Sequence, residues 1–195
     1  MPFFIYPLFG YISGSLPFAV WITRLFTGAD VRDGGSGHSG ATNTIRQAGW
    51  WAGVLVLVLD IGKGFLPVYL ALRADLPVWA IALTAGLIVI GHCWPMFAGF
   101  RGGMGVAAAA GTLLAASPLG ALAAFALLLL ALLIFRHAAR GAVVAAVLLL
   151  PLFWLLGLRG VEFWVAIAIA PVIALRFFVE DWNRQYRELW LDREK

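Results

Sequence analysis

Charged residues and cysteine are scarce in this sequence. Only 12% of its 195 residues are charged, against about 25% in an ordinary soluble domain, while 63% are hydrophobic and the mean hydropathy is +0.93. Water cannot be the main solvent of such a surface, so a soluble domain, a disordered chain and a secreted disulfide scaffold are excluded. Cys93 is the only cysteine, which rules out an intrachain disulfide and a metal cluster built on thiolates.

Several familiar signatures are missing as well. The chain has no Walker loop and no dinucleotide-binding fingerprint, because no Gly-Lys-Ser/Thr follows its glycine-rich segment and no strand pattern precedes it. It shows no Ser-His-Asp constellation and no set of His, Asp or Glu with metal-ligand spacing, so we expect neither a cofactor nor a metal ion. With a net charge of only +4, we expect no nucleic-acid partner.

Long apolar runs are what the chain has in abundance. A membrane-spanning helix needs roughly 20 mostly apolar residues. Five blocks satisfy this requirement: Phe3–Phe26, Trp51–Leu72, Pro77–Phe100, Gly141–Leu158 and Val161–Val179. A sixth block, Val106–Phe135, would be about 45 Å long as one straight helix, against a hydrocarbon core of about 30 Å. Ser117-Pro118 offers a break near its middle, because proline disfavours the helical conformation of the residue before it.

The placement of arginine and lysine decides between six and seven spans. If the break is real, 11 of the 14 basic residues lie on one side of the membrane and 2 on the other, with Lys63 inside a span; without it the split is 5 against 8. Positive residues collect on the cytoplasmic face. The sequence therefore predicts an all-α, polytopic integral membrane protein with seven transmembrane helices, the N-terminus outside and the C-terminus cytoplasmic. We expect a single domain over residues 1–195, in which residues 180–195 form an amphipathic interfacial tail helix with membrane lipids as partners.

The first of two glycine-rich stretches on the predicted cytoplasmic side is GGSGHSGATNTIR, from Gly34 to Arg46. Its glycines allow positive φ, so that successive N–H groups can converge on one anion. Hydroxyl and amide side chains add neutral donors, and Arg46 adds a fork-shaped cation. This composition is suited to holding a phosphate; the alternative is a flexible connection between two helices.

The second stretch is GHCWPMFAGFRGGMG, from Gly91 to Gly105. His92 ends a span, and Arg101 precedes glycines that open the next helix, where exposed N–H groups and an arginine form another anion site. The alternative is an arginine that snorkels to lipid headgroups. Two such loops on one face favour a shared anionic ligand over either alternative.

Two ionisable residues lie inside a span. Asp60 and Lys63 are three residues apart on one helix face, so their side chains can pair. Such residues are costly in a membrane and usually face the protein interior. We favour a structural ion pair over a direct catalytic role. His137, beside Arg136, is interpreted either as a base or as a histidine that contacts lipid headgroups.

Several ordered motifs give the sequence a resemblance to a known family, the acyl-phosphate-dependent glycerol-3-phosphate acyltransferases, or PlsY family, of bacterial membrane enzymes. Gly14-Ser15-Leu16-Pro17 resembles the family's GSxPF, and DVRDGGSGHSGATNTIRQAG resembles IRxxGSGNxGATNxxRxxG. The segment LVLDIGKGFLPV resembles LDxxKGxxPV, and GHCWPMFAGFRGGMGVA resembles GHxxPxFxxFKGGKGVAT. The chain is identified as a member of this family, whose seven-span topology agrees with the charge pattern.

The resemblance implies a one-step acyl transfer at the bacterial cytoplasmic (inner) membrane, with the active-site loops on the cytoplasmic side. A fatty acyl phosphate would acylate the 1-hydroxyl of glycerol 3-phosphate, giving lysophosphatidic acid and phosphate, the first step of phospholipid synthesis. It implies catalytic roles for Ser36, His92 and Arg46. The substrate-binding residues that it implies are Gly35, Gly37, His38, Gly40, Thr42, Asn43, Arg101, Gly102, Gly103, Arg136, Arg140 and Asn183.

The chain departs from the family pattern at four places. GSGN reads GSGH, so His38 replaces an amide, and FKGGKG reads FRGGMG, so Met104 replaces a lysine expected to meet a substrate phosphate. The TRYVSLAS region has lost its serines and gained Arg140, while HRENIKRL has become Glu180–Arg187. Losing one charged phosphate contact costs about 1.5–3 kcal/mol. Our hypothesis is that Arg140 reaches the vacated position.

The sequence is consistent with three functions. The first is an active acyltransferase of the PlsY type. The second is a divergent paralogue that binds a phosphorylated lipid or anion without this reaction, or that uses another acceptor. The third is a small anion transporter, which we disfavour because Asp60 and Lys63 are the main charges within the spans, whereas a transport pathway usually needs more.

Overall fold

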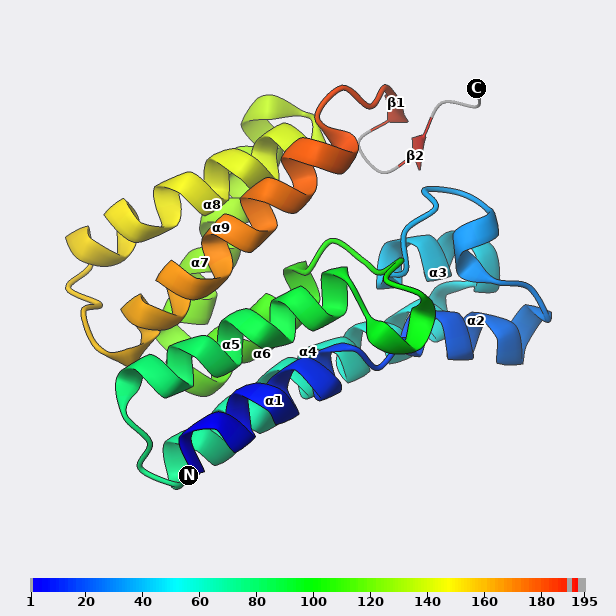
Figure 1. Cartoon of the computed structure of the whole chain (residues 1–195). Helices are drawn as coiled ribbons and strands as arrows, with labels where there is room; N and C mark the ends of the chain where they lie inside the picture. Colours follow the sequence, from blue (N-terminus) through cyan, green and yellow to red (C-terminus); the bar gives the residue numbers. More distant parts are fainter. Residues whose placement is uncertain (1, 189–190, 193–195) are drawn as a thin grey trace.

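The computed structural model describes residues 2–188 and 191–192 as a bundle of long helices with a short hairpin in the tail (Figure 1). Its elements, in chain order, are α1 (Pro2–Gly14), α2 (Phe18–Thr27), the 3-10 turn η1 (Val31–Asp33), α3 (Ala41–Ala48), α4 (Trp50–Arg73), α5 (Val78–Cys93), the 3-10 turn η2 (Met96–Ala98), α6 (Val106–Ala116), α7 (Pro118–Phe135), α8 (Ala138–Leu155), α9 (Val161–Asp181), β1 (Tyr186–Glu188) and β2 (Leu191–Asp192).

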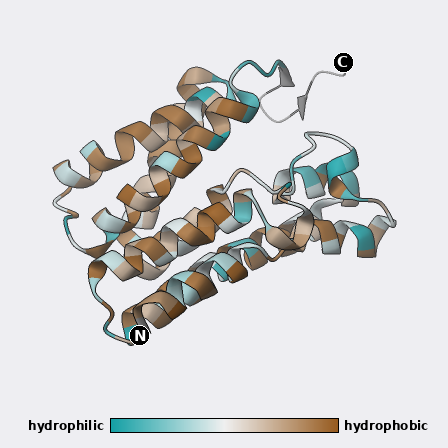
Figure 2. Ribbon diagram, viewed as in Figure 1, coloured by the Kyte–Doolittle hydropathy of each residue, from teal (hydrophilic) through white to brown (hydrophobic). Residues whose placement is uncertain are grey.

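The long helices have the composition of membrane spans. Within the described residues, six helical segments are long and apolar enough to cross a membrane, counting 3–27 as one segment, whereas α6 is shorter. Most residues of these helices are hydrophobic, and hydrophilic residues gather around α3 and at the carboxyl end of α9 (Figure 2). Large apolar side chains such as Leu25, Phe125 and Leu155 are exposed. The fold is therefore that of an integral membrane protein.

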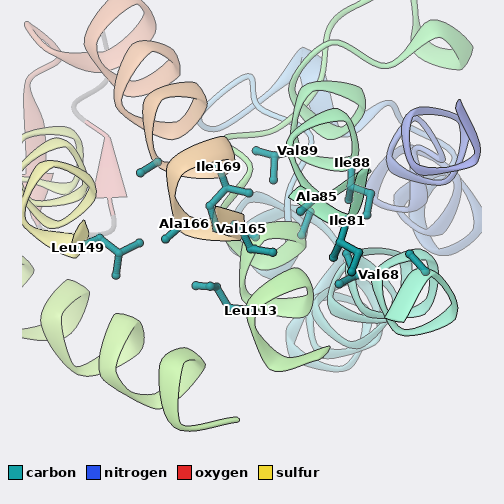
Figure 3. Close-up of a cluster of buried hydrophobic side chains, with 14 of the residues drawn as sticks. Val68, Ile81, Ala85, Ile88, Val89, Leu113, Leu149, Val165, Ala166 and Ile169 are labelled. Carbon is teal, nitrogen blue, oxygen red and sulfur yellow. The ribbon is translucent and has the colours of Figure 1, made fainter. Parts of the chain in front are cut away.

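The core is formed where α5 lies between α1 and α9, with α4 and α6 packed against each other beside them. Figure 3 shows apolar side chains from α4, α5, α6, α8 and α9 meeting there, among them Val68, Ile88, Leu113 and Ile169. Without a hydrophobic driving force between helices in lipid, close packing supplies the attraction, and small residues permit it. At Gly64 of α4 a Cβ atom would overlap the carbonyl of Ala108 in α6, so these helices approach closely only because a glycine stands there.

The first span is not one helix, contrary to the prediction for Phe3–Phe26. The chain breaks between α1 and α2 at Ser15-Leu16-Pro17. Pro17 lacks an N–H and restricts Leu16, which interrupts the ladder of helical hydrogen bonds. Lys63 Nζ donates to the carbonyl of Leu16 at 2.8 Å, while Asp60 accepts from the same Nζ at 2.8 Å. The predicted intramembrane pair is present, and its geometry is that of a structural support for this break.

The predicted break in the sixth apolar block occurs at Ser117, which caps α7 by accepting a hydrogen bond from Gly120 N. The outer ends of α6 and α7 lie at the same end of the molecule. Gly102, just before α6, accepts from Ser39 N, and His137, just after α7, bonds to the Arg184 carbonyl. The chain therefore reverses direction at Ser117.

Two other expectations were wrong. The stretch from Gly34 to Arg46 is not a loop throughout, because α3 begins at Ala41 and carries its last six residues. The tail is not a helix over residues 180–195. Helix α9 ends at Asp181, and residues 186–188 and 191–192 pair as antiparallel strands; residues 189–190 and 193–195 lie outside the described part of the chain.

Candidate functional site

A cavity of about 1260 Å³ opens at the polar end of the molecule, beside α3 and the carboxyl end of α9. Both glycine-rich stretches and the segment that ends α9 contribute to its walls. Its lining residues are Arg32, Asp33, Gly34, Gly35, Ser36, Gly37, His38, Arg46, Trp94, Phe100, Arg101, Gly102, Arg176, Glu180, Asp181, Asn183, Arg184 and Gln185. Both glycine-rich stretches therefore line one cavity, as a shared site requires.

The first glycine-rich loop is shaped by Asn43, which projects from α3 and is buried. Its Oδ1 accepts from Ser36 N at 3.0 Å, and its Nδ2 donates to the carbonyls of Val31, Gly34 and His38 at 2.7, 3.1 and 3.1 Å. One amide side chain thus replaces the regular backbone partners that the loop lacks.

The expected cluster of free loop amides does not form at two positions. Ser36 N is bonded to Asn43, and Gly37 N donates to the Gly34 carbonyl at 3.1 Å. These two N–H groups therefore cannot also bind an anion in this arrangement. Side chains, above all the arginines of the lining, provide the donors that face the cavity.

Arg32, in the turn η1 just before the first glycine-rich stretch, joins this part of the chain to the second stretch. Its Nη1 donates to the Ala98 carbonyl at 2.7 Å, while its Nε and Nη2 donate to the Asp30 carboxylate at 2.9 and 2.7 Å. The side-chain hydrogen bonds from Arg32 hold the pKa of Asp30 well below its usual range, against the opposing effect of burial. The same hydrogen bonds raise the pKa of Arg32, so this pair is ionised at neutral pH.

The carboxyl end of α9 is fastened to the first loop by three residues. His38 Nε2 lies 3.1 Å from Asp181 Oδ1, and Arg184 Nη1 lies 2.9 Å from the same oxygen. Arg184 Nη2 also donates to the Ser36 carbonyl at 3.0 Å. His38 stands where the family pattern has an amide, and Asp181 stands where it has a cation, so the two departures meet in one ion-pair cluster.

Arg176 reaches the second glycine-rich loop from α9. Its Nε donates to the Gly103 carbonyl at 3.2 Å, its Nη1 bonds to Glu180 Oε1 at 2.7 Å, and its guanidinium lies over the Trp94 ring, 5.2 Å from the centroid. Although Arg176 is only 6% exposed, it forms part of the cavity wall.

His92 lies behind the cavity wall rather than in it. Its Nδ1 is 3.8 Å from Asp60 Oδ1, and its carbonyl accepts from Gly103 N at 3.1 Å. A Cβ atom at Gly103 would overlap the His92 ring nitrogen and the Ser39 carbonyl, so only glycine lets the second loop pass so close. His92, Asp60 and Lys63 line a separate small void of about 10 Å³.

The predicted site residues fall into two groups. Those that line the cavity are Gly35, Ser36, Gly37, His38, Arg46, Arg101, Gly102 and Asn183. Those that do not are Gly40, Thr42, Asn43, His92, Gly103, Arg136 and Arg140. Thr42, Arg136 and Arg140 are exposed, and Arg140 lies over the Trp182 ring, 5.8 Å from the centroid.

Three lining arginines were missed as site residues: Arg32, Arg176 and Arg184. Arg32 falls within a motif quoted for the family, so its position was available as a signal. Arg176 and Arg184 lie in or after the last apolar span and were counted only as cytoplasmic charges. With Arg46 and Arg101 they give the cavity five arginines against three acidic residues, which makes it suited to anionic ligands.

Together the apolar helix bundle and the arginine-lined cavity define an integral membrane protein with a cavity suited to anionic ligands at one end. A family model described as "Glycerol-3-phosphate acyltransferase" matches residues 4–184. The glycerol-3-phosphate acyltransferase of Jannaschia sp. (strain CCS1) is 45% identical over 170 residues, which cover 87% of this chain and 82% of the relative. That of Listeria monocytogenes serotype 4a (strain HCC23) is 38% identical over 172 residues, covering 86% and 83%.

A solved structure of PlsY (YgiH), an integral membrane glycerol 3-phosphate acyltransferase in its glycerol 3-phosphate form, has a TM-score of 0.81 to this chain at 34% identity, covering 92% of this chain and 90% of that one. The lysophosphatidic acid form gives 0.78 at the same identity, covering 90% and 88%. The chain therefore belongs to the glycerol-3-phosphate acyltransferase (PlsY) family. Acyl transfer is the class of its activity, and phospholipid biosynthesis is the setting.

Proposed function

We propose that this protein transfers a fatty acyl group from acyl phosphate to the 1-hydroxyl of glycerol 3-phosphate, giving lysophosphatidic acid and inorganic phosphate. The observation that carries the proposal is that two glycine-and-arginine stretches, far apart in sequence, line one cavity large enough for two phosphorylated groups. The forms in which PlsY (YgiH) has been solved support glycerol 3-phosphate and lysophosphatidic acid as the ligands of this chain.

The reaction balances without a protein nucleophile. The hydroxyl oxygen of glycerol 3-phosphate attacks the acyl carbonyl carbon and forms the ester bond. The bond from that carbon to the phosphate oxygen breaks, the phosphate leaves with the electron pair, and the hydroxyl proton passes to the departing phosphate. Acyl phosphates are already activated, so holding both reactants in line and neutralising their charge supply the acceleration.

The side chains divide this work according to their position. Arg46 and Arg101 neutralise the two phosphates, since they line the cavity from different segments. Ser36 offers its hydroxyl to the donor phosphate. Asn43 acts by holding the first loop in shape, and His92 acts as a positioning residue, because its carbonyl accepts an amide of the second loop.

The acyl tail lies against the apolar helices. A second cavity, of about 100 Å³, lies between α6, α7, α8 and α9 and is lined mainly by alanine, leucine and isoleucine. Small side chains there leave room for hydrocarbon. Arg136 and Arg140, which are exposed outside the main cavity, contact anionic lipid headgroups at the same membrane face.

The chain crosses the bacterial cytoplasmic membrane seven times, with the N-terminus outside and the C-terminus in the cytoplasm. At 11 residues α6 is only about 16 Å long, and the non-helical segment from Arg101 to Gly105 adds to that crossing. Non-helical backbone is tolerated at membrane depth where protein covers it. The burial of Gly102, Gly103 and Gly105 meets that condition.

The test is release of inorganic phosphate by the protein purified in detergent. Release should require both a fatty acyl phosphate and glycerol 3-phosphate, and lysophosphatidic acid should appear in equal amount. Arg46→Gln and Arg101→Gln should each lower kcat/KM by about tenfold to a hundredfold, since each removes a charged hydrogen bond to phosphate. Arg159→Gln, at an exposed arginine in the turn between α8 and α9, is the matched control. Phosphate release no faster than without protein would refute the proposal.

A second candidate function, binding of a phosphorylated lipid or anion without turnover, is favoured by the place of Met104. Its side chain packs against an apolar cluster of Ala139, Ala142 and Phe177 and is absent from the cavity lining. The position therefore supplies no charge to a substrate. Activity that appears only after Met104→Lys would support this alternative, and activity of the unaltered protein would remove it.

A further inference from the structure

The lysine that the family pattern places at position 104 has a counterpart elsewhere in this chain. The peptide before Met104 presents the Gly103 carbonyl, and the guanidinium of Arg176 is hydrogen-bonded to that carbonyl at 3.2 Å. A cation thus stands beside the same turn of the second loop, although it comes from α9, 73 residues further along the chain. Arg176 also lines the main cavity, as Met104 does not.

The contacts of Arg176 fix its orientation and leave donors for a ligand. Nε is used by Gly103, one Nη1 proton is used by Glu180, and the flat face lies toward Trp94. A guanidinium carries five N–H donors in a rigid fork, so these contacts leave others on Nη1 and Nη2. Its carboxylate partner is Glu180. The Glu180 side chain is 38% exposed, whereas the Arg176 side chain is 7% exposed.

A buried charge of this kind is costly unless it is well paired. A structural ion pair alone would be better placed at the surface, where desolvation costs little. Here the buried guanidinium is part of the wall of a cavity that four other arginines also line. Because five arginines line the cavity against three acidic residues, that placement is suited to an anionic ligand that enters the cavity and adds negative charge to that of Glu180.

Arg140, which the sequence suggested as the replacement, does not occupy this position. It is exposed, it lies over the Trp182 ring, and it is not among the residues that line the cavity. The hypothesis that Arg140 reaches the place vacated at position 104 is therefore wrong for this structure.

We propose that Arg176 is a phosphate-binding residue, which takes over from α9 the role of the lysine that Met104 replaces. Its ligand is the phosphate group of a substrate, from either the acyl phosphate or glycerol 3-phosphate. This inference rests on the proposed function. It extends that function by naming a binding residue that lies outside all the motifs by which the family is recognised in this chain.

The experiment compares Arg176→Met, Arg176→Lys, Met104→Lys and the double variant Met104→Lys/Arg176→Met with the unaltered protein. The KM for each substrate is measured by phosphate release, and the Kd for inorganic phosphate by calorimetry. Arg176→Met should raise the KM of one substrate, and the Kd, by about tenfold to a hundredfold. The substrate whose KM rises identifies which phosphate is bound. In the double variant the new lysine should recover at least half of the loss on a logarithmic scale.

Arg159→Met is the matched control for removing an arginine, and each variant is first checked for an unchanged unfolding temperature. If Arg176→Met does not fold, Arg176→Lys decides, because it keeps the charge but loses the fork; it should raise the Kd about threefold to tenfold. A folded Arg176→Met with KM and Kd within twofold of the unaltered protein overturns the inference, as does a larger loss in Arg140→Met.

The two proposals fail in different ways. Absence of turnover in the unaltered protein refutes the acyltransferase, yet the calorimetric comparison still decides whether Arg176 binds phosphate. Normal turnover with an indifferent Arg176 refutes this inference alone.

Discussion

At the scale of single residues, the candidate site depends on a few side chains that replace missing backbone partners. Asn43 is the clearest case, because one buried amide accepts from Ser36 and donates to three carbonyls of the same loop. An amide is the side chain that can do both, since it carries an acceptor oxygen and two N–H donors. The loop that carries Ser36 and His38 therefore owes its shape to α3.

Replacement of Asn43 tests this dependence. Asn43→Ala should lower the free energy of unfolding by about 1–3 kcal/mol, the cost of leaving buried polar groups unpaired, and should lower kcat/KM at least tenfold. Asn43→Asp is the matched variant of equal size. It keeps the acceptor for Ser36 N but turns the donor that faces three carbonyls into an acceptor, so it should be at least as damaging. An Asn43→Asp protein with normal stability and activity would show that packing, not hydrogen bonding, is what matters there.

Residues of the site differ in how far the sequence could reveal them. Ser36, Arg46 and Arg101 lie in recognisable stretches whose composition alone indicates an anion site. Arg176 has no such local signal, because it is a single arginine in an apolar helix, and its contact with Gly103 is created by the packing of α9 against α5. The partner of His38 could not be foreseen either, since it lies 143 residues away.

At the scale of elements, glycine decides how closely two helices approach. Gly64→Ala should place a Cβ atom against the Ala108 carbonyl, push α4 away from α6 and lower the free energy of unfolding by about 1–3 kcal/mol. Gly62→Ala, on the same helix, is the matched control: a Cβ there meets nothing within 4 Å, so it should leave stability unchanged or raise it by up to about 1 kcal/mol. Unfolding can be followed with a thiol-reactive dye, because the single cysteine, Cys93, is buried. Equal effects of the two substitutions would contradict the close contact.

The cluster of His38, Asp181 and Arg184 at the end of α9 is predicted to hold the first loop in the shape that activity requires. Asp181→Arg should place a second cation beside Arg184, remove the carboxylate that contacts both His38 and Arg184, release the first loop and lower kcat/KM by about tenfold. His38→Asn/Asp181→Arg restores both residues of the family pattern. It should recover activity beyond the sum of the two single changes, which a double-mutant cycle measures. Strict additivity would mean that the two positions do not cooperate.

A matched control for that cycle lies at the opposite end of the same helix. Glu162, in the first turn of α9, accepts a hydrogen bond from Gly160 N and is remote from the cavity. Glu162→Gln changes an acidic residue of α9 without touching the His38 cluster, so kcat/KM should stay within twofold of its normal value.

The helix boundaries differ in how clearly the local sequence predicts them. The break at Ser117 was predicted because the apolar block is too long for one span and contains a proline at its middle. The break at Pro17 carries a similar signal, but the length of Phe3–Phe26 suits one span and so concealed it. The prediction for the tail was wrong. Apolar side chains recur there at helical spacing, but α9 ends at Asp181 and residues 186–188 and 191–192 pair as strands.

At the scale of the whole molecule, the predicted number of membrane crossings puts the two glycine-rich stretches on the same face. The charge asymmetry of the sequence predicts both on one face, and the cavity that Ser36 and Arg101 line together agrees with that prediction. The number of membrane crossings does not predict how deeply each side chain is buried or which residues it contacts. Those depend on how α5 and α9 pack, and no local pattern encodes that packing.

The turns at the two ends of the bundle make the seven-span topology testable with single cysteines in a Cys93→Ala background. Figure 1 shows the turns α4–α5 and α8–α9 at the end of the bundle opposite α3 and the carboxyl end of α9, beside which the cavity lies. If α6 completes a crossing, four helices separate Asp75 from Arg159, and both turns lie outside. An impermeant maleimide should then label Asp75→Cys and Arg159→Cys in intact spheroplasts, and Arg136→Cys only after permeabilisation. If α6 does not cross, only three crossings remain, so Asp75→Cys and Arg159→Cys would react from opposite faces and the arginine-lined cavity would lose its single cytoplasmic side.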